Sequence, residues 1–151
     1  MQMGGLKFIR DSSIISMLLV LSTIPHICSI LPLLKYYKTH TFGYTNTIVI
    51  STLLSILYHL YEESNHKITF MDYFGAGGWV VYDIYMGYFY TNKNTVFVII
   101  LVNALSFFIN RQIPYNLYYP LNHSLWHLIN AYKCYYVSNS IGVGIATTVF
   151  V

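Results

Sequence analysis

Two histidines stand four residues apart in an apolar stretch late in the chain, in the segment NHSLWHLI at residues 122–129. Residues at positions i and i+4 of an α-helix lie on one face, so His123 and His127 could bind the same metal ion. A histidine pair at this spacing is more often a hydrogen-bonded structural contact. The spacing alone therefore leaves both interpretations open.

Ser55 and His59 repeat this spacing in an earlier apolar segment, and Asp72 follows after a short polar loop. Three neutral histidines and a water would give zinc four ligands with one open position, which is the arrangement of a catalytic site. Each residue also has an ordinary explanation. A serine in a transmembrane helix usually bonds to backbone, and Asp72 could cap its helix or be solvated.

The composition is typical of a membrane protein. Of 151 residues, 56% are hydrophobic and 9% are charged, and the mean hydropathy is +0.51, whereas a soluble domain has roughly 25% charged residues. The net charge of +3 comes from single Lys and Arg residues between apolar runs, so nucleic acid is not expected as a partner. Cys28 and Cys134 lie in apolar runs, where a thiol behaves as a small hydrophobe.

The elements that must position these side chains are predicted to be membrane-spanning helices. About 20 helical residues cross the hydrocarbon core, and the sequence predicts one all-α domain over residues 1–151, a polytopic transmembrane bundle with about five spans. The predicted spans are residues 12–34, 46–61, 69–90, 95–109 and 114–137. The first run is too long for a signal peptide and lacks a small-residue cleavage site. The apolar tail, residues 138–151, is expected to be a frayed or lost span.

Topology tests whether these candidate residues can meet. If the second span ends on one side of the membrane, the third begins there, the fourth returns there and the fifth begins there. All of the candidate residues then lie toward one face, which is also the face of the amino terminus. This parity favours a shared site, because unrelated polar residues would have no reason to gather on one side.

The remaining ionisable residues are predicted to be structural. Asp83 lies about 16 Å further along its helix than Asp72, at 1.5 Å per residue, so it is expected to pair with a Tyr or a Lys instead of binding the metal. His26 is expected to be a hydrogen-bonded core residue. His40 and His66 are expected in loops.

The order of three motifs resembles the CREST superfamily of membrane hydrolases and receptors, over roughly residues 31–135. The motifs are SILYH at residues 55–59, MDYFGAG at 71–77 and HSLWH at 123–127. The superfamily includes alkaline ceramidases, progestin and adipoQ receptors and myomaker-like proteins. The myomaker-like branch is the most similar, because an aromatic residue there precedes the first histidine, as Tyr58 does here, and the histidine pair often reads H-S-x-x-H.

The resemblance implies a seven-helix fold with zinc held by His59, His123 and His127. Ser55 and Asp72 would take the places of the family's serine and aspartate. This chain departs from the family because about five spans are predicted where the family has seven. The missing pair would fall between the aspartate helix and the histidine-pair helix, which preserves the parity. The pocket would then be smaller, more open, or completed by a second subunit of a homo-oligomer.

Two functions from different classes are therefore expected. The first is zinc-dependent hydrolysis of an amide or ester of a membrane lipid near the interface, with Asp72 as general base and Ser55 helping the metal to stabilise the oxyanion. The resemblance implies ceramides, or the phospholipid acyl chains of GPI-anchored proteins, as substrates. The second is a non-catalytic receptor-like or membrane-fusion protein with a structural zinc. A small multi-pass protein with coincidental histidines is the third alternative.

Overall fold

The structure is a computed structural model, and it describes residues 13–34, 39–61, 66–90, 92–112 and 118–149. Its helices are α2 (Ser13–Cys28), α3 (Leu31–Leu34), α4 (Thr39–Leu60), α5 (His66–Tyr90), α6 (Lys93–Gln112) and α7 (Tyr118–Val149). The described segments contain no strand. The prediction of an all-α fold is therefore confirmed.

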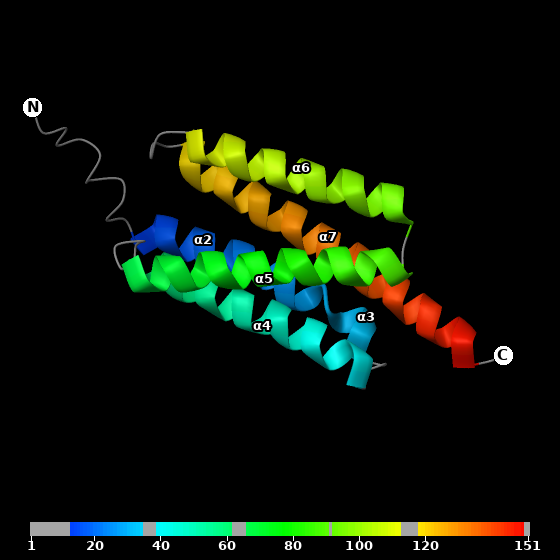
Figure 1. Cartoon of the computed structure of the whole chain (residues 1–151). Helices are drawn as coiled ribbons and strands as arrows, with labels where there is room; N and C mark the ends of the chain where they lie inside the picture. The colour runs from blue at the N-terminus through cyan, green and yellow to red at the C-terminus, as the bar shows by residue number, and fades with distance from the viewer. Residues whose placement is uncertain (1–12, 35–38, 62–65, 91, 113–117, 150–151) are drawn as a thin grey trace, which may run out of the picture.

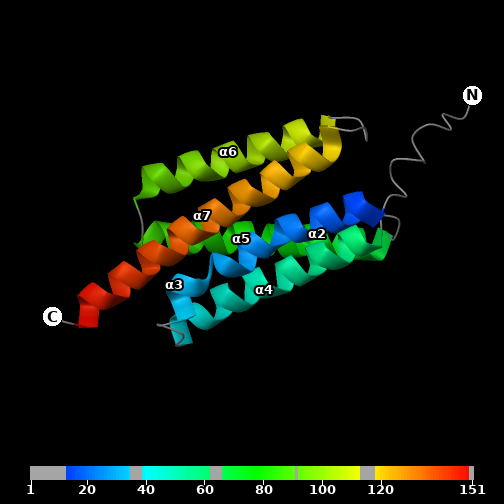
Figure 2. The ribbon, with the colours of Figure 1, turned by 180° about the vertical axis from the view of Figure 1, so that it is seen from behind.

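Successive long helices run in alternating directions along the bundle (Figure 1). The start of α2, the end of α4, the start of α5, the end of α6 and the start of α7 all lie at the left of that view. We call this the amino-terminal end of the bundle. From behind, α6 again lies along α7 on one side and α4 lies on the opposite side (Figure 2). The predicted parity is therefore present in the structure.

The largest differences from the predicted spans are in the first, second and last helices. The first span is divided, because α2 ends at Cys28 and α3 begins at Leu31. Pro32 explains this break, since its ring clashes with the carbonyl four residues earlier in a continuous helix. Helix α4 begins at Thr39, before the predicted start, and α7 continues to Val149 through a tail that contains no proline.

Two loop predictions were wrong for the same reason. His40 lies within α4, and His66 is the first residue of α5. Both helices extend beyond their apolar runs, because backbone hydrogen bonding within a helix does not require apolar side chains at its ends. Hydropathy therefore predicted the apolar part of each of these helices and not its full length.

The apolar core lies in the half of the bundle away from the amino-terminal end. Its buried members are Ile30, Leu33, Tyr44, Ile48, Trp79, Met86, Cys134, Val137 and Ile141. Gly87 allows α5 and α6 to approach closely beside this core, since a Cβ there would lie 2.6 Å from Cγ1 of Val96. The polar side chains of the candidate site lie in the other half of the bundle.

A buried ion pair joins three helices next to this core. The Nζ of Lys133 on α7 lies 2.7 Å from Oδ2 of Asp83 on α5, and the hydroxyl of Tyr44 on α4 donates to Oδ1 of Asp83 at 2.7 Å. Asp83 is 0% exposed and Lys133 is 2% exposed. The prediction that Asp83 pairs with a Tyr or a Lys is confirmed, and both partners are present.

Two stretches of the described chain are long and apolar enough to cross a membrane. They are Ile14–Leu34, which includes α2 and α3, and Lys93–Asn110 in α6. Length and hydropathy therefore indicate membrane association for these two stretches. The other three predicted spans stay predictions at this point.

Candidate metal centre and adjoining cavity

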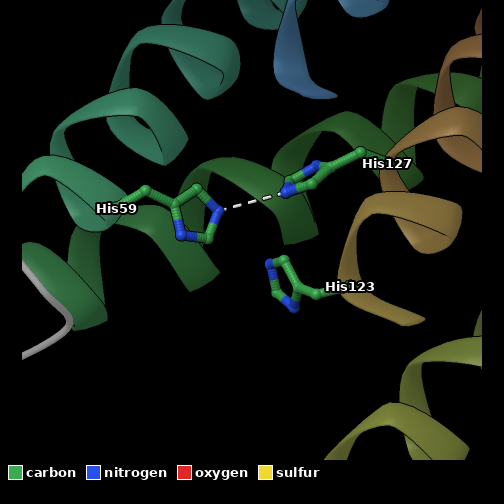
Figure 3. A group of neighbouring side chains, drawn as sticks. All are labelled: His59, His123 and His127. Carbon is green, nitrogen blue, oxygen red and sulfur yellow. Dashed lines mark hydrogen bonds between the residues drawn. The ribbon is translucent and has the colours of Figure 1, made fainter. Parts of the chain in front are cut away.

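The three histidines predicted as ligands meet at the amino-terminal end of the bundle. His59 lies in the last turn of α4, and His123 and His127 lie on successive turns of α7. Their exposed fractions are 2%, 8% and 0%. One ligand nitrogen from each lies within 4.8 Å of those of the other two. Figure 3 shows the rings of His59 and His127 facing each other, with His123 beside them.

The nitrogen separations suit a shared metal ion. The Nε2 atoms of His59 and His127 lie 3.1 Å apart. Two nitrogens bound to one tetrahedral zinc at about 2.0–2.1 Å would lie about 3.3–3.4 Å apart. The ring of His123 lies 4.9 Å from the ring of His59 and 4.7 Å from that of His127, measured between centroids. Small side-chain rotations would therefore bring all three donors to one ion.

Helix α2 fixes the backbone of two of these ligands. The hydroxyl of Ser16 donates to the carbonyl oxygen of His59 at 2.6 Å. The Nε2 atom of His26 donates to the carbonyl oxygen of His127 at 2.9 Å, because that oxygen can only accept. The His59 carbonyl lies in the last turn of its helix, where an acceptor has no partner within the helix. Since His26 is 3% exposed, the prediction that it is a hydrogen-bonded core residue is confirmed.

Asn110 on α6 contacts the third ligand. Its side-chain Nδ2 lies 2.7 Å from Nδ1 of His123, and Asn110 is 5% exposed. A histidine that binds metal through one ring nitrogen usually has its other nitrogen held by a hydrogen bond. Asn110 therefore occupies the position of a residue that orients the His123 ring.

Ser55 and Asp72 lie in a small cavity beside the histidines and not among the ligands. The cavity has a volume of about 40 Å³, and Ser55, Asp72 and His127 all line it. Ser55 and Asp72 are each 7% exposed. The structure thus brings the predicted serine and aspartate next to one of the three histidines. A cavity of this size can hold water.

An apolar groove lies on the other side of the cavity wall, between α5, α6 and α7. Its volume is about 280 Å³, and Tyr73, Ile100, Phe107 and Phe108 contribute to its lining. Four residues line both the groove and the cavity: Ala76, Val80, Asn103 and Trp126. The polar cavity and the apolar groove are therefore neighbours with a common wall.

Sequence reasoning missed several residues of this region. Asn103 and Asn110 are spaced i and i+7, which places them on one face of α6, and this spacing was a usable signal. The two tryptophans, Trp79 and Trp126, carried no comparable signal, because aromatic residues are common in membrane helices. Ser16 also gave none, and for His26 the sequence predicted a hydrogen bond but not its partner, because both contacts depend on how α2 packs against α4 and α7.

Comparisons of the chain with protein-family models, with curated proteins and with solved structures found no match. The firm features of this region are a buried group of three histidines that could hold a metal ion and an adjoining cavity lined by Ser55 and Asp72.

Proposed function

We propose that this protein is a multi-pass membrane hydrolase that uses zinc to cleave an amide or ester bond of a lipid. The observation that carries the proposal is the convergence of His59, His123 and His127 beside a cavity that Ser55 and Asp72 line. Three histidines with room for a fourth ligand are the donor set of catalytic zinc sites. The resemblance of the three motifs to the CREST superfamily, closest to its myomaker-like branch, points to the same chemistry.

The distribution of polar and apolar side chains supports a bundle that lies within the bilayer. Large apolar side chains point outward on every long helix, and Phe74, Phe97 and Leu121 are 75%, 67% and 70% exposed. Charged and imidazole side chains such as Lys133 and His127 are buried instead. A soluble protein rarely exposes so much contiguous apolar surface, whereas polar residues in membrane helices face the bundle interior.

The residues of the cavity have separate proposed roles. A zinc ion held by the three histidines supplies Lewis-acid activation of water and of a carbonyl group. Asp72 accepts a proton from a water molecule while the oxygen of that water bonds to the carbonyl carbon of the substrate. Ser55 donates a hydrogen bond to the oxygen that becomes negatively charged. The C–N or C–O bond then breaks, and Asp72 returns its proton to the leaving amine or alcohol.

The apolar groove supports a lipid as the substrate. Its lining is largely apolar, and it shares a wall with the cavity that holds Ser55 and Asp72. A molecule with a hydrocarbon chain next to a carbonyl group would place the chain in the groove and the carbonyl in the cavity.

The first test is the metal content of the purified protein. We expect about one zinc per chain in mild detergent without chelators, and little zinc in His59→Ala, His123→Ala and His127→Ala. The measurement is elemental analysis of metal against protein. Ser124→Ala serves as a control, because Ser124 lies between the two α7 ligands in sequence and is not part of the histidine group. Metal-free wild-type protein would refute the site.

The second test is hydrolysis by the zinc-loaded protein. We expect release of fatty acid from one or more members of a panel of lipid amides and esters. Asp72→Asn should abolish release while leaving the zinc content unchanged, because Asp72 lies in the cavity and not in the ligand group. Folded, zinc-loaded wild-type protein that releases no fatty acid from any lipid would contradict the catalytic proposal.

A structural zinc is the second candidate function, and the burial of the cluster favours it. All three histidines are at most 8% exposed, and a closed metal site can pin helices together without catalysis. In that case the protein would be a receptor-like or fusion protein of the same superfamily. Metal removal would then lower thermal stability, and Asp72→Asn would leave biological activity unchanged.

A further inference from the structure

Three residues that line the cavity beside the histidines carry buried hydrogen-bond donors that have no partner among the described residues. They are Nε1 of Trp79 on α5, Nδ2 of Asn103 on α6 and Nε1 of Trp126 on α7. Each of these atoms is buried and has no hydrogen-bond partner among the described residues. Trp79 and Asn103 are 4% and 7% exposed. The three residues that carry these donors come from three different helices, and all three line one small space.

These donors would lower the stability of the protein if no hydrogen-bond acceptor satisfied them. A buried donor without a partner costs about 1–3 kcal/mol, and buried polar groups in native proteins are nearly always satisfied by protein, water or a ligand. The indole N–H of tryptophan can only donate. An occupant that satisfies Trp79 and Trp126 must therefore present hydrogen-bond acceptors, such as the oxygen of a carbonyl group.

The residues that line both the cavity and the apolar groove indicate what kind of molecule could occupy the cavity. Asn103 and Trp126 line both spaces, so an acceptor bound to them lies directly beside the groove. Tyr73, Phe107 and Phe108 contribute aromatic rings to the lining of that groove. A ligand that fills both spaces would carry an oxygen acceptor at one end of a hydrocarbon chain.

We propose that Trp79, Asn103 and Trp126 bind the acyl carbonyl oxygen of a lipid whose hydrocarbon chain lies in the groove between α5, α6 and α7. This inference rests on the proposed function for the reaction that follows, but the binding step is separate from it. The donor set places the carbonyl beside His127 and within the cavity that also contains Asp72 and Ser55. These three residues thereby act in binding, whereas Asp72 transfers the proton.

The tryptophans themselves provide the measurement. The chain contains two tryptophans, and both line this cavity, so the intrinsic fluorescence of the zinc-loaded protein reports on its occupancy. The probes are a long-chain methyl ketone, which has a carbonyl oxygen and cannot be hydrolysed, and an alkane of the same length. We expect the ketone to bind at least tenfold more tightly than the alkane.

Variants then assign this preference to the three donors. The variants are Trp79→Phe, Trp126→Phe and Asn103→Leu, and each removes an N–H while retaining a side chain of similar shape. Each variant should reduce the preference for the ketone by roughly tenfold, which corresponds to the loss of one hydrogen bond of about 1.4 kcal/mol. Phe107→Leu on the groove is the matched control, because it should weaken both probes equally. Retained zinc content verifies that each variant is folded.

Two results would overturn the inference. One is equal binding of ketone and alkane by the wild-type protein, as expected if only water occupies the cavity. The other is an unchanged preference in all three donor variants. Failure of the hydrolase proposal would look different, since the preference for the ketone would remain while no lipid is cleaved. Hydrolysis without any preference for the ketone would instead contradict this inference and leave the hydrolase intact.

Discussion

At the scale of single residues, the orientation of His123 depends on the side chain of Asn110. The amide nitrogen of Asn110 lies 2.7 Å from Nδ1 of His123, and its oxygen is buried with no hydrogen-bond partner in the described part of the chain. Rotation of the amide by half a turn would let this oxygen accept a hydrogen bond from Nδ1–H. His123 could then bind metal through Nε2, in the manner of histidine ligands held by a carbonyl group.

Replacement of Asn110 by Leu should weaken metal binding by about 10- to 100-fold, which is the usual cost of losing a residue that holds a ligand. The measurement is the zinc affinity by competition with a chelator of known strength. Ser106→Ala on the same helix is the control, because its hydroxyl bonds to the carbonyl of Val102 in α6 itself. Equal affinities of Asn110→Leu and the wild type would show that Asn110 does not orient the ligand.

At the scale of helices, the Asp83–Lys133 ion pair joins α5 to α7, and Tyr44 adds α4. Asn130 accepts a further hydrogen bond from Lys133 at 3.1 Å. A buried charge with a partner is tolerated, but a buried charge that has lost its partner is strongly unfavourable. The pair therefore makes the packing of these helices depend on both charges together.

Asp83→Leu should destabilise the protein by about 3–5 kcal/mol, because Lys133 would remain buried without its counter-charge. The double variant Asp83→Leu/Lys133→Met removes both charges and should recover most of the stability. Unfolding of each variant in detergent is the measurement. If the double variant is as unstable as Asp83→Leu, the loss is due to packing and not to the unpaired charge.

Two neighbouring glycines on α5, Gly77 and Gly78, differ in their relation to the groove. A Cβ at Gly77 or at Gly78 would meet no atom within 4 Å, so a larger side chain fits either position without a clash. Gly77 lines the apolar groove, and Gly78 is not part of its lining.

We expect Gly77→Leu to weaken lipid binding or hydrolysis by tenfold or more, because its side chain would fill part of the groove. Gly78→Leu should leave both within about twofold of the wild type, which makes it a matched control. Michaelis constants for lipids of different chain length are the measurement. Equal effects at the two glycines would indicate that the groove does not hold the chain.

At the scale of the whole molecule, many large apolar side chains are exposed, while several charged and imidazole side chains are buried. The stretches that pass the hydropathy test for a span are Ile14–Leu34 and Lys93–Asn110. Helices α4, α5 and α7 contribute the three histidines, Ser55 and Asp72 of the cavity, and the ion pair, and these polar side chains lower the mean hydropathy of their helices. A test on average hydropathy therefore does not select these three helices, and only the proposed function treats them as spans.

The proposed multi-pass topology places opposite ends of α5 on opposite sides of the membrane. We expect His66→Cys and Asn92→Cys, each made in a protein whose Cys28 and Cys134 are replaced by alanine, to react with an impermeant maleimide from opposite sides of sealed vesicles. Both positions are exposed in the structure. Labelling of both from the same side would exclude a membrane-spanning α5.

The sequence by itself determined that the fold is helical and that the histidine motifs could converge. Apolar runs separated by polar segments require helices in an apolar environment, since backbone groups must be satisfied within each segment. The order of the runs then decides which helix ends share a side. For that reason His59, His123 and His127 could be predicted as a group before their positions were known.

Tertiary structure alone decided how the helices are rotated and which side chains complete the site. Ser16 and His26 reach the ligand backbones because α2 packs against α4 and α7. Trp79, Asn103 and Trp126 line one cavity because α5, α6 and α7 present those particular faces to each other. Helix rotation results from the packing of many side chains from several helices at once, and local sequence patterns do not contain that information.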